Sequence, residues 1–285
     1  MATKRRVSPE RYDRAYLLSE NTEGFQEFSQ GSLSFVKKQQ LDTLELGPGV
    51  SLLEVGFGRG EFLYHCARLG ARVSAIDYSE AALEIGKQTL ADFPDADLRV
   101  ADCKDLPFET NSFDRVYSGD VLEHQDLEDG AVMLREMYRV VRPGGFMLVH
   151  TSPNTIFTRY VLPIAKPYLK RIDPESVRAL EAHMKVNESV HVHEYNLISL
   201  RKVVRIAGLE DAELWIARDI LRSAQHRHTR NLSQRPLVRL AAHLGRFRAA
   251  RFLLGNDLYV KCRKLAGAAP LTDSRGRAVA TPPLP

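Results

Sequence analysis

Two short strands that flank a run of alternating glycines constrain this chain of 285 residues more than any other feature. Residues 51–55 (SLLEV) are an apolar strand, and residues 72–77 (RVSAID) are a second strand that ends in Asp77. Three glycines follow the first strand: Gly56, Gly58 and Gly60. A strand that turns sharply into a helix needs glycine's conformational freedom and a bare backbone against which a ligand can lie. The pattern predicts half of a nucleotide-binding sheet.

The residues around the glycines indicate which ligand this loop binds. The dinucleotide fingerprint would place its third glycine at position 61, but Glu61 stands there and would repel a pyrophosphate. Glu54 precedes the first glycine by two positions. This combination suits a ligand with an adenosine, a cationic amino-acid end and no phosphate, which is S-adenosylmethionine. Asp77 is placed to accept hydrogen bonds from both ribose hydroxyls.

Four successive segments extend the pattern beyond the glycine loop. They read LLEVGFGRGEF, AIDYSEAALEIGK, VADCKDLPFETNSFDRVYSGDVLEH and MYRVVRPGGFMLVHTSPN. In this order they resemble the motifs of class I S-adenosylmethionine-dependent methyltransferases, most closely the small-molecule branch that includes quinone-biosynthesis and sugar methyltransferases. The resemblance covers roughly residues 40–155 and continues more weakly through HVHEYN. It implies an enzyme of the EC 2.1.1 class with S-adenosylmethionine as cofactor.

Alternating strands and helices predict an α/β fold, a doubly wound Rossmann-like sheet that is mostly parallel and has an antiparallel last strand. Further strands are expected at 98–101, 113–118, 145–151, 213–216 and 258–263. We divide the chain into N-terminal lid helices (1–40), a cofactor-binding core (41–152), a lid insertion after the fifth strand (153–190), a C-terminal part with an arginine-rich helical insertion (191–264) and a disordered tail (265–285).

Candidate cofactor-binding residues follow from the rule that ligands lie outside the carboxyl ends of the strands. By that rule they are Glu54, Gly56, Gly58, Gly60, Asp77, Asp102 and Ser118 to Asp120. The family resemblance implies that Asp102 and Cys103 read the adenine amino group, and Tyr78 is expected against the adenine face. Residues 12–16 resemble the lid helix that folds over the cofactor in this branch, with Tyr16 facing the sulfonium cation. The alternative is that Tyr12 and Tyr16 pack on the sheet as one helix face.

Three histidines are candidates for the catalytic base that takes the acceptor's proton: His124, His191 and His193. His124 follows the fourth strand in a Leu-Glu-His triplet that is also structural in many relatives. The other two alternate in an extended segment and face either the site or solvent. Some quinone-type relatives bind a divalent ion through this triplet, which here would be Glu123 and His124. Because no third and fourth ligand stand at a recognisable spacing, we assign no metal.

The family does not name the methyl acceptor, since fold and cofactor are shared by many substrates. The insertion mixes aromatic residues, prolines and cations, which suits an amphiphile. Our leading prediction is a hydroxyl oxygen of a sugar, a glycan or a glycolipid intermediate, and the alternative is a quinone, polyketide or other phenolic acceptor.

Charge is unevenly distributed along the chain. Its net charge is +4, yet the segment 218–251 contains nine arginines and one acid, Asp219. This excess indicates either a solvated helical face or attraction to an anionic partner, including peripheral contact with a membrane. A nucleic-acid-associated role is the most distant alternative, because Phe247 and Phe252 are almost the only aromatic residues there for base stacking.

Targeting and redox features are sparse. No apolar run of signal-peptide or membrane-spanning length is present, and the three cysteines are scattered. We therefore expect a cytoplasmic protein without a disulfide framework. The sequence does not predict an oligomeric state.

Overall fold

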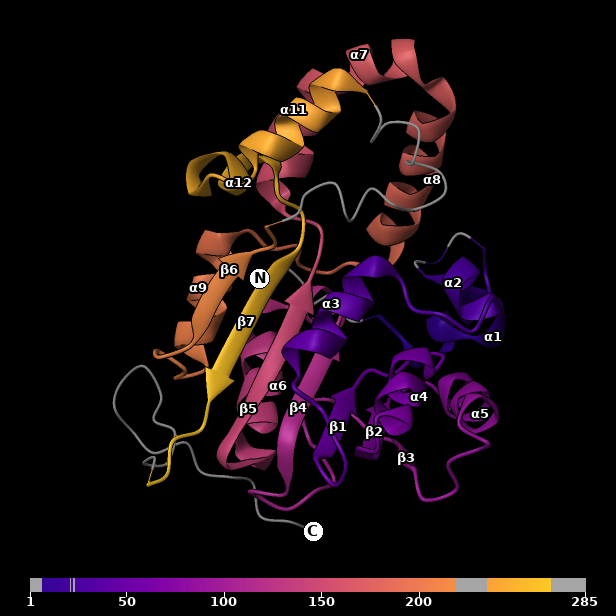
Figure 1. The fold of residues 1–285 in the computed structure, drawn as a ribbon, viewed down its shortest axis with the longest axis vertical. Helices are drawn as coiled ribbons and strands as arrows, with labels where there is room; N and C mark the ends of the chain where they lie inside the picture. The colour runs from indigo at the N-terminus through magenta and orange to yellow at the C-terminus, as the bar shows by residue number, and fades with distance from the viewer. Residues whose placement is uncertain (1–6, 21, 23, 219–234, 268–285) are drawn as a thin grey trace.

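One seven-stranded sheet organises the protein, and its strands lie in the order β3-β2-β1-β4-β5-β7-β6 (Figure 1). The computed structural model describes residues 7–20, 22, 24–218 and 235–267. The strands are β1 (Ser51–Val55), β2 (Arg72–Asp77), β3 (Asp97–Val100), β4 (Phe113–Gly119), β5 (Val141–Thr151), β6 (Glu213–Ile216) and β7 (Leu258–Arg263). Strands β1 to β5 pair in parallel, whereas β7 runs antiparallel to both of its neighbours. The predicted doubly wound sheet with an antiparallel last strand is confirmed.

Helices connect the parallel strands and cover both faces of the sheet. The N-terminal segment holds η1 (Pro9–Tyr12), α1 (Arg14–Leu17), α2 (Phe25–Ser29) and α3 (Phe35–Thr43). The crossover elements are α4 (Glu61–Arg68), α5 (Glu80–Thr89), η2 (Leu122–His124), α6 (Leu127–Val140) and α9 (Leu197–Ile206). Ser79 caps α5 as the sequence predicts, because its side chain accepts a hydrogen bond from the Ala82 backbone N–H. Each crossover places the loop that follows a strand at the same edge of the sheet.

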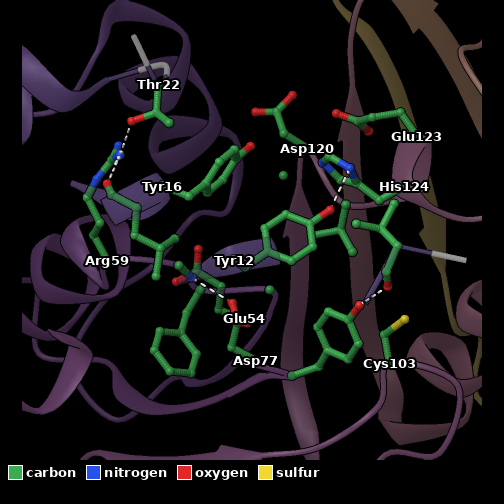
Figure 2. A pocket seen from close by; sticks show the side chains of 18 of the residues that line it. Tyr12, Tyr16, Thr22, Glu54, Arg59, Asp77, Cys103, Asp120, Glu123 and His124 are labelled. Atoms are coloured by element: carbon green, nitrogen blue, oxygen red, sulfur yellow. Dashed lines mark hydrogen bonds between the residues drawn. The ribbon is translucent and has the colours of Figure 1, made fainter. Parts of the chain in front are cut away.

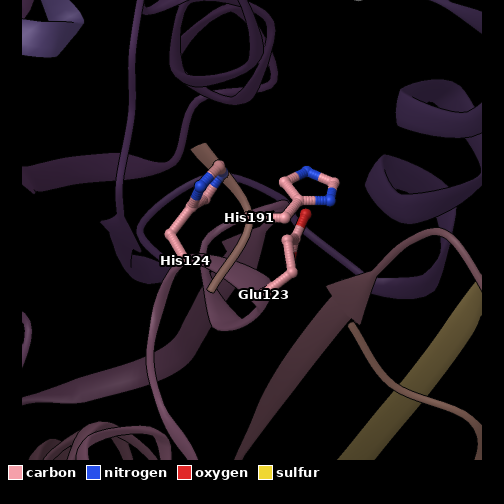
Figure 3. A group of neighbouring side chains, drawn as sticks. All are labelled: Glu123, His124 and His191. Carbon is pink, nitrogen blue, oxygen red and sulfur yellow. The ribbon is translucent and has the colours of Figure 1, made fainter. Parts of the chain in front are cut away.

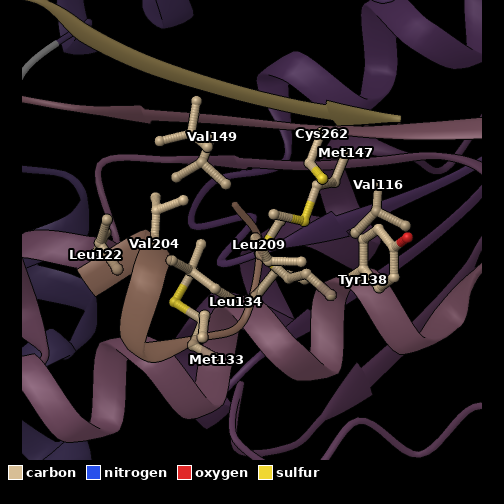
Figure 4. Close-up of a cluster of buried hydrophobic side chains, with 14 of the residues drawn as sticks. Val116, Leu122, Met133, Leu134, Tyr138, Met147, Val149, Val204, Leu209 and Cys262 are labelled. Carbon is tan, nitrogen blue, oxygen red and sulfur yellow. The ribbon is translucent and has the colours of Figure 1, made fainter. Parts of the chain in front are cut away.

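Alternation along the strands divides the core into two layers. Leu53 and Val55 of β1 face the layer formed with α6 and α9, whereas Leu52 faces the layer formed with α3, α4 and α5. The first layer includes Val116, Met147 and other side chains shown in Figure 4. Both layers exclude water from the central strands, so the strand ends are held rigidly.

A second group of helices, here named the cap, lies beyond the carboxyl ends of β4 and β5 (Figure 1). It consists of the π-helical turn η3 (Phe157–Val161), α7 (Leu162–Ile172), α8 (Pro174–Val190), α11 (Pro236–Leu244) and α12 (Arg248–Leu254). The predicted lid insertion therefore forms helices despite its prolines, two of which stand in the first turns of α7 and α8 where no amide hydrogen is needed. The structure does not describe residues 219–234 of the arginine-rich segment or 268–285 of the predicted tail.

Several element bounds differ from those expected. Strand β5 begins at Val141, before the Pro-Gly-Gly sequence expected to precede it, and β3 begins one residue earlier than predicted. No helix in the described ranges is long and apolar enough to cross a membrane. Cys66, Cys103 and Cys262 are all buried and free.

Candidate functional site

A pocket of about 250 Å³ opens at the carboxyl ends of β1, β2 and β4 (Figure 2). Four parts of the chain form its walls: the N-terminal segment, the loops after the strands, η2 and the end of α8. Most of the predicted site residues line it: Tyr16, Glu54, Gly56, Gly58, Asp77, Tyr78, Asp102, Cys103, His124 and His191. Gly60, Ser118 and His193 are not among its lining residues.

The three glycines of the loop after β1 have different surroundings, although all three have positive φ angles. A Cβ atom on Gly56 would lie 2.2 Å from the Val121 side chain, and one on Gly60 would lie 3.0 Å from Leu90. At Gly58 a Cβ atom would meet no atom within 4 Å. Gly56 and Gly60 are thus required by packing, whereas Gly58 presents bare backbone to the pocket.

Asp77 ends β2 beside this bare backbone. Its carboxylate accepts hydrogen bonds from the backbone N–H groups of Gly58 (2.9 Å) and Ser79 (3.0 Å), one on each oxygen. Burial raises the pKa of Asp77 above its ordinary value, against the opposing effect of these N–H groups. Each oxygen keeps a further lone pair, so the carboxylate can accept two hydroxyl hydrogens from a vicinal diol.

Glu54 is a buried acid with spare hydrogen-bonding capacity. Its Oε2 is buried and has no hydrogen-bond partner among the described residues. Burial raises the pKa of Glu54 well above its ordinary value, and the charge on Lys37 only partly opposes this. A buried carboxylate without a partner is costly, so this position favours a ligand that brings an ammonium group or another donor.

Glu61, in contrast, is fully paired. It contacts Lys37 Nζ at 2.6 Å and an Arg59 guanidinium nitrogen at 2.9 Å. Although burial opposes ionisation, these two cations lower the pKa of Glu61 to about 2. The two cations therefore neutralise the charge with which Glu61 was expected to repel a phosphate. Glu61 by itself is a weaker argument against a pyrophosphate ligand than the sequence suggested. Arg59 also donates to the Leu17 carbonyl, which ties the loop to the N-terminal segment.

The opposite end of the pocket contains the predicted adenine-binding residues. Asp102 and the buried Cys103 follow β3, and burial raises the pKa of the Cys103 thiol to about 12, so the thiol stays protonated. The Tyr78 hydroxyl donates to the Val7 carbonyl and so fixes the start of the described chain over the pocket. Ser118 lies inside the sheet, where its hydroxyl donates to the Val55 carbonyl at 2.8 Å. It holds β1 and β4 together and does not face the ligand space.

Two tyrosines of the N-terminal segment close one side of the pocket. The Tyr12 and Tyr16 rings meet edge to face, with centroids 5.3 Å apart. The ring centroids of Tyr12 and Tyr78 are 6.0 Å apart. Burial raises the pKa of both hydroxyls, that of Tyr12 well above its ordinary value. They remain neutral, and their electron-rich faces are suited to a cation.

His124 faces the pocket from η2. Its Nδ1 lies 3.0 Å from the Val190 carbonyl oxygen and 3.0 Å from the Tyr12 hydroxyl. Because a carbonyl oxygen can only accept, the Val190 contact assigns the proton to Nδ1 and leaves a lone pair on Nε2. Burial, together with the neighbouring His191, lowers the pKa of His124 to about 4. The ring is therefore a neutral proton acceptor at physiological pH.

His191 is the residue that follows α8, and its ring lies beside that of His124. The two rings lie 5.1 Å apart, and His191 Nδ1 contacts Glu194 Oε1 at 3.1 Å. The Glu123 backbone carbonyl accepts from the Val192 N–H at 2.9 Å, which holds this segment against η2. The end of α8 is thus bound to a turn about 70 residues earlier in the chain.

Glu123, His124 and His191 together form a candidate metal-binding group (Figure 3). One ligand atom from each lies within 4.8 Å of the other two. Both histidines have their Nδ1 engaged by an acceptor, an arrangement that orients Nε2 toward a metal or a substrate. The sequence indicated Glu123 and His124 as the pair that would bind a metal, and the structure adds His191 to this candidate group. The distance of His191 along the chain gives no recognisable spacing.

His193 lies elsewhere. Its ring packs against Tyr195 with centroids 4.7 Å apart, and burial lowers its pKa. His191 and His193 were expected on the same side of the extended segment. In the structure they are separated, because only His191 turns toward His124.

A buried histidine lies between two carboxylates next to the pocket. His150 of β5 is 1% exposed and lies between Asp120 (3.1 Å) and Asp257 (3.2 Å). Burial alone would lower the pKa of His150, but the two carboxylates outweigh it and raise the pKa well above its ordinary value. Asp120 has a positive φ of 57° and lines the pocket. Its carboxylate therefore lies against the buried His150 imidazole, a contact that only the tertiary structure reveals.

Comparison with known proteins agrees with this geometry. Residues 53–149 match the family described as "Methyltransferase domain". Demethylmenaquinone methyltransferase of Staphylococcus aureus (strain MRSA252) is 33% identical in an alignment 141 residues long that covers 45% of this chain and 58% of that protein. Both comparisons find similarity to methyltransferases over part of the chain. The aligned part spans 58% of the length of this relative, so the alignment concerns the methyltransferase domain and not the whole of that protein.

Solved structures show the same fold for the methyltransferase domain and the elements around it. Haemonchus contortus phospholethanolamine N-methyltransferase 2, in complex with phosphomonomethylethanolamine and S-adenosylhomocysteine, has a TM-score of 0.57 and 17% identity, with 91% of this chain and 61% of that chain covered. Geranyl diphosphate C-methyltransferase from Streptomyces coelicolor A3(2), in complex with Mg²⁺, geranyl diphosphate and S-adenosyl-L-homocysteine, has a TM-score of 0.54 and 15% identity, with 89% of each chain covered. Both of these solved complexes contain S-adenosylhomocysteine.

Proposed function

We propose that this protein binds S-adenosylmethionine along the Gly58 backbone and transfers its methyl group to a hydroxyl oxygen of a small amphiphilic acceptor. The observation that carries the proposal is the combination, in one pocket, of the open backbone at Gly58, the half-satisfied Asp77 carboxylate and the unpartnered Glu54 oxygen. These three features match a sugar diol and an ammonium group, and the cofactor carries both.

The remaining cofactor contacts follow from the same placement. Asp77 accepts from the ribose hydroxyls, and Glu54 accepts from the ammonium group of the methionine part. Lys37 and Arg59 lie on the same side as Glu54 and provide positive charge for the cofactor carboxylate. Asp102 and Cys103 then border the adenine. Glu54 should become ionised when the ammonium group binds, since a partner charge offsets the cost of burial.

The acceptor half of the pocket provides alignment and a proton acceptor. Tyr12 and Tyr16 shield the sulfonium from water, and His124 presents an unprotonated ring nitrogen with the His191 ring beside it. As the acceptor oxygen bonds to the methyl carbon, the carbon–sulfur bond breaks with its electron pair left on sulfur. The hydroxyl proton passes to His124 or His191, and Asp120, held by His150, bears the compensating charge. Positioning and exclusion of water supply most of the acceleration.

A sugar hydroxyl of a glycan or glycolipid is our first candidate acceptor. An aliphatic hydroxyl has a high pKa and benefits most from a positioned base, and two histidines are available here. The second candidate is a quinol or another phenol, which the similarity to demethylmenaquinone methyltransferases favours. Incubating the enzyme with methyl-labelled cofactor and separated cell extracts distinguishes the two, because label would enter either glycolipids or lipid-soluble aromatic compounds.

Titration calorimetry with S-adenosylmethionine and S-adenosylhomocysteine tests the cofactor site directly. We expect binding by the wild type and a loss of at least about a hundredfold in affinity for Asp77→Ala, because two charge-assisted hydrogen bonds are lost. Asp95→Ala, an exposed acid in the loop before β3, is the matched control and should bind normally. Equal binding by wild type and Asp77→Ala would contradict the proposed site.

A further inference from the structure

Two segments of the cap expose apolar side chains in a regular pattern. Of the twelve large hydrophobic side chains that are exposed in the described residues, eight lie in the stretches 157–172 and 235–254. Tyr160, Ile164 and Tyr168 recur every four residues along η3 and α7. Leu237, Leu240 and Leu244 recur at helical spacing along α11, and Phe247 follows. Stripes with this spacing normally face a core, yet Ile164 is 81% exposed.

The same two stretches are strongly basic. They contain nine arginines and lysines and no acidic residue: Arg159, Lys166, Lys170, Arg171, Arg235, Arg239, Arg246, Arg248 and Arg251. Among the described residues, Lys166 alone of these nine pairs with a carboxylate, that of Glu181 on α8 at 2.5 Å. Long basic side chains beside exposed apolar ones are typical of helices that lie in a membrane interface.

The two stretches form one surface of the cap. Arg235 donates to the Ile172 carbonyl at 3.0 Å, which joins the start of α11 to the end of α7. In Figure 1, α7 and α11 lie together at the end of the molecule farthest from the amino ends of the parallel strands. Helix α8 packs against α7, and its residues His183, Val186 and Asn187 line the pocket. The exposed surface is thus one helix away from the pocket.

We propose that this surface, residues 157–172 and 235–254, docks on a lipid bilayer that contains anionic headgroups. The arginines and lysines attract the headgroups, and the apolar stripes enter the interface. A second copy of this chain is a poor occupant, since a symmetric contact would bring nine cations against nine. RNA is a poorer occupant than a bilayer, since five of the eight exposed side chains are leucines or isoleucine and offer nothing to a base or a phosphate, although three aromatic rings could stack on bases. Docking is independent of the methyl acceptor.

Vesicle flotation with the full-length protein tests this inference without cofactor or acceptor. We expect binding to phosphatidylcholine vesicles that contain one-third phosphatidylglycerol, little binding to pure phosphatidylcholine, and weakening as salt rises. Arg239→Gln/Arg248→Gln should weaken binding roughly fivefold for each arginine removed. Ile164→Ser/Leu240→Ser should weaken it by at least about tenfold. Because all four side chains are exposed, these variants should fold.

Matched controls lie on other elements. Ile198→Ser on α9 removes a side chain that is 70% exposed, and Arg72→Gln/Lys87→Gln removes two exposed cations from β2 and α5. Both should bind vesicles like the wild type. The inference would be overturned by equal binding to neutral and anionic vesicles or by no binding to either. It would also be overturned if the control variants lost as much vesicle binding as the test variants. A dimer detected by sedimentation that Ile164→Ser/Leu240→Ser dissociates would also overturn it. So would binding to RNA that Arg239→Gln/Arg248→Gln weakens, if the protein does not bind vesicles. Calorimetric cofactor binding is a separate readout, so either proposal can fail alone.

Discussion

Gly56 and Gly58 both adopt the left-handed region, with φ angles of 81° and 55°, yet they serve different purposes. Gly56 allows Val121 to pack against the loop, whereas Gly58 leaves space that a ligand can enter. The sequence shows both as members of one motif. Only the surroundings separate a packing requirement from a binding requirement.

Alanine substitutions should separate these two requirements. Gly58→Ala is expected to lower the free energy of unfolding by about 1–2 kcal/mol, from the positive φ alone, and to reduce cofactor affinity by more than about tenfold. Gly56→Ala adds a collision with Val121 and should cost about 2–5 kcal/mol. Urea denaturation measures the stabilities, and calorimetry measures the affinities. A Gly58→Ala variant that binds S-adenosylmethionine normally would show that the ligand does not follow this backbone.

His124 should stay neutral throughout the physiological range. With its pKa lowered to about 4, the ring should show no titration between about pH 5.5 and 8, whereas an ordinary histidine titrates near 6.5. Nuclear magnetic resonance of the histidine rings measures this, and the His124→Asn variant identifies the signal. A midpoint at 6.5 or above would mean that the ring is solvated, and its assignment as a poised base would fail.

Charged contacts at the ends of strands hold elements in place around the pocket. Asp120 follows β4, His150 lies in β5 and Asp257 precedes β7, so one buried imidazole links three strands. The segment after α8 is similarly joined to η2 through Glu123 and His124. The local sequences show no sign of these links because the partners are far apart in the chain.

His150→Gln should destabilise the protein by about 3 kcal/mol, at the low end for a broken buried ion pair because Asp120 is one-third exposed. The pKa of His150 is raised on folding, so its contribution is full below about pH 6.5 and is lost as the pH rises through the folded value. The difference from wild type in urea denaturation should therefore shrink at alkaline pH. The exposed His243→Gln is the control. A difference that grows with pH would refute a protonated His150.

At the scale of the whole molecule, the pocket is assembled from the N-terminal segment, the sheet and the cap. Tyr12, Asp77 and Asn187 line it from these three parts. A ligand bound there contacts all three, so binding should reduce the opening of the least anchored part. We expect that part to be the N-terminal segment, since η1 and α1 contain only four residues each.

S-adenosylmethionine should therefore protect the N-terminal segment from trypsin. We consider an S-adenosylmethionine concentration about one hundred times its dissociation constant. Cleavage after Arg14 should then slow by up to about a hundredfold if the ligand binds only the closed form. Cleavage after Lys264, which lies beyond β7, serves as the control and should not change. Mass spectrometry of timed digests gives both rates. Equal protection at the two sites would indicate a general stabilisation rather than closure of the segment over the pocket.

The sequence alone determined the sheet and the position of Gly58 and Asp77 beside the pocket. Strand periodicity, Gly58 and Asp77 are local signals, and parallel strands always bring their carboxyl ends to the same edge. The acceptor half was decided by the tertiary structure, because His191 meets His124, and Asp120 meets His150, only after distant elements pack together. The separation of His191 from His193 was likewise decided there, since two alternate positions in an extended segment cannot show which one faces a turn formed about 70 residues earlier.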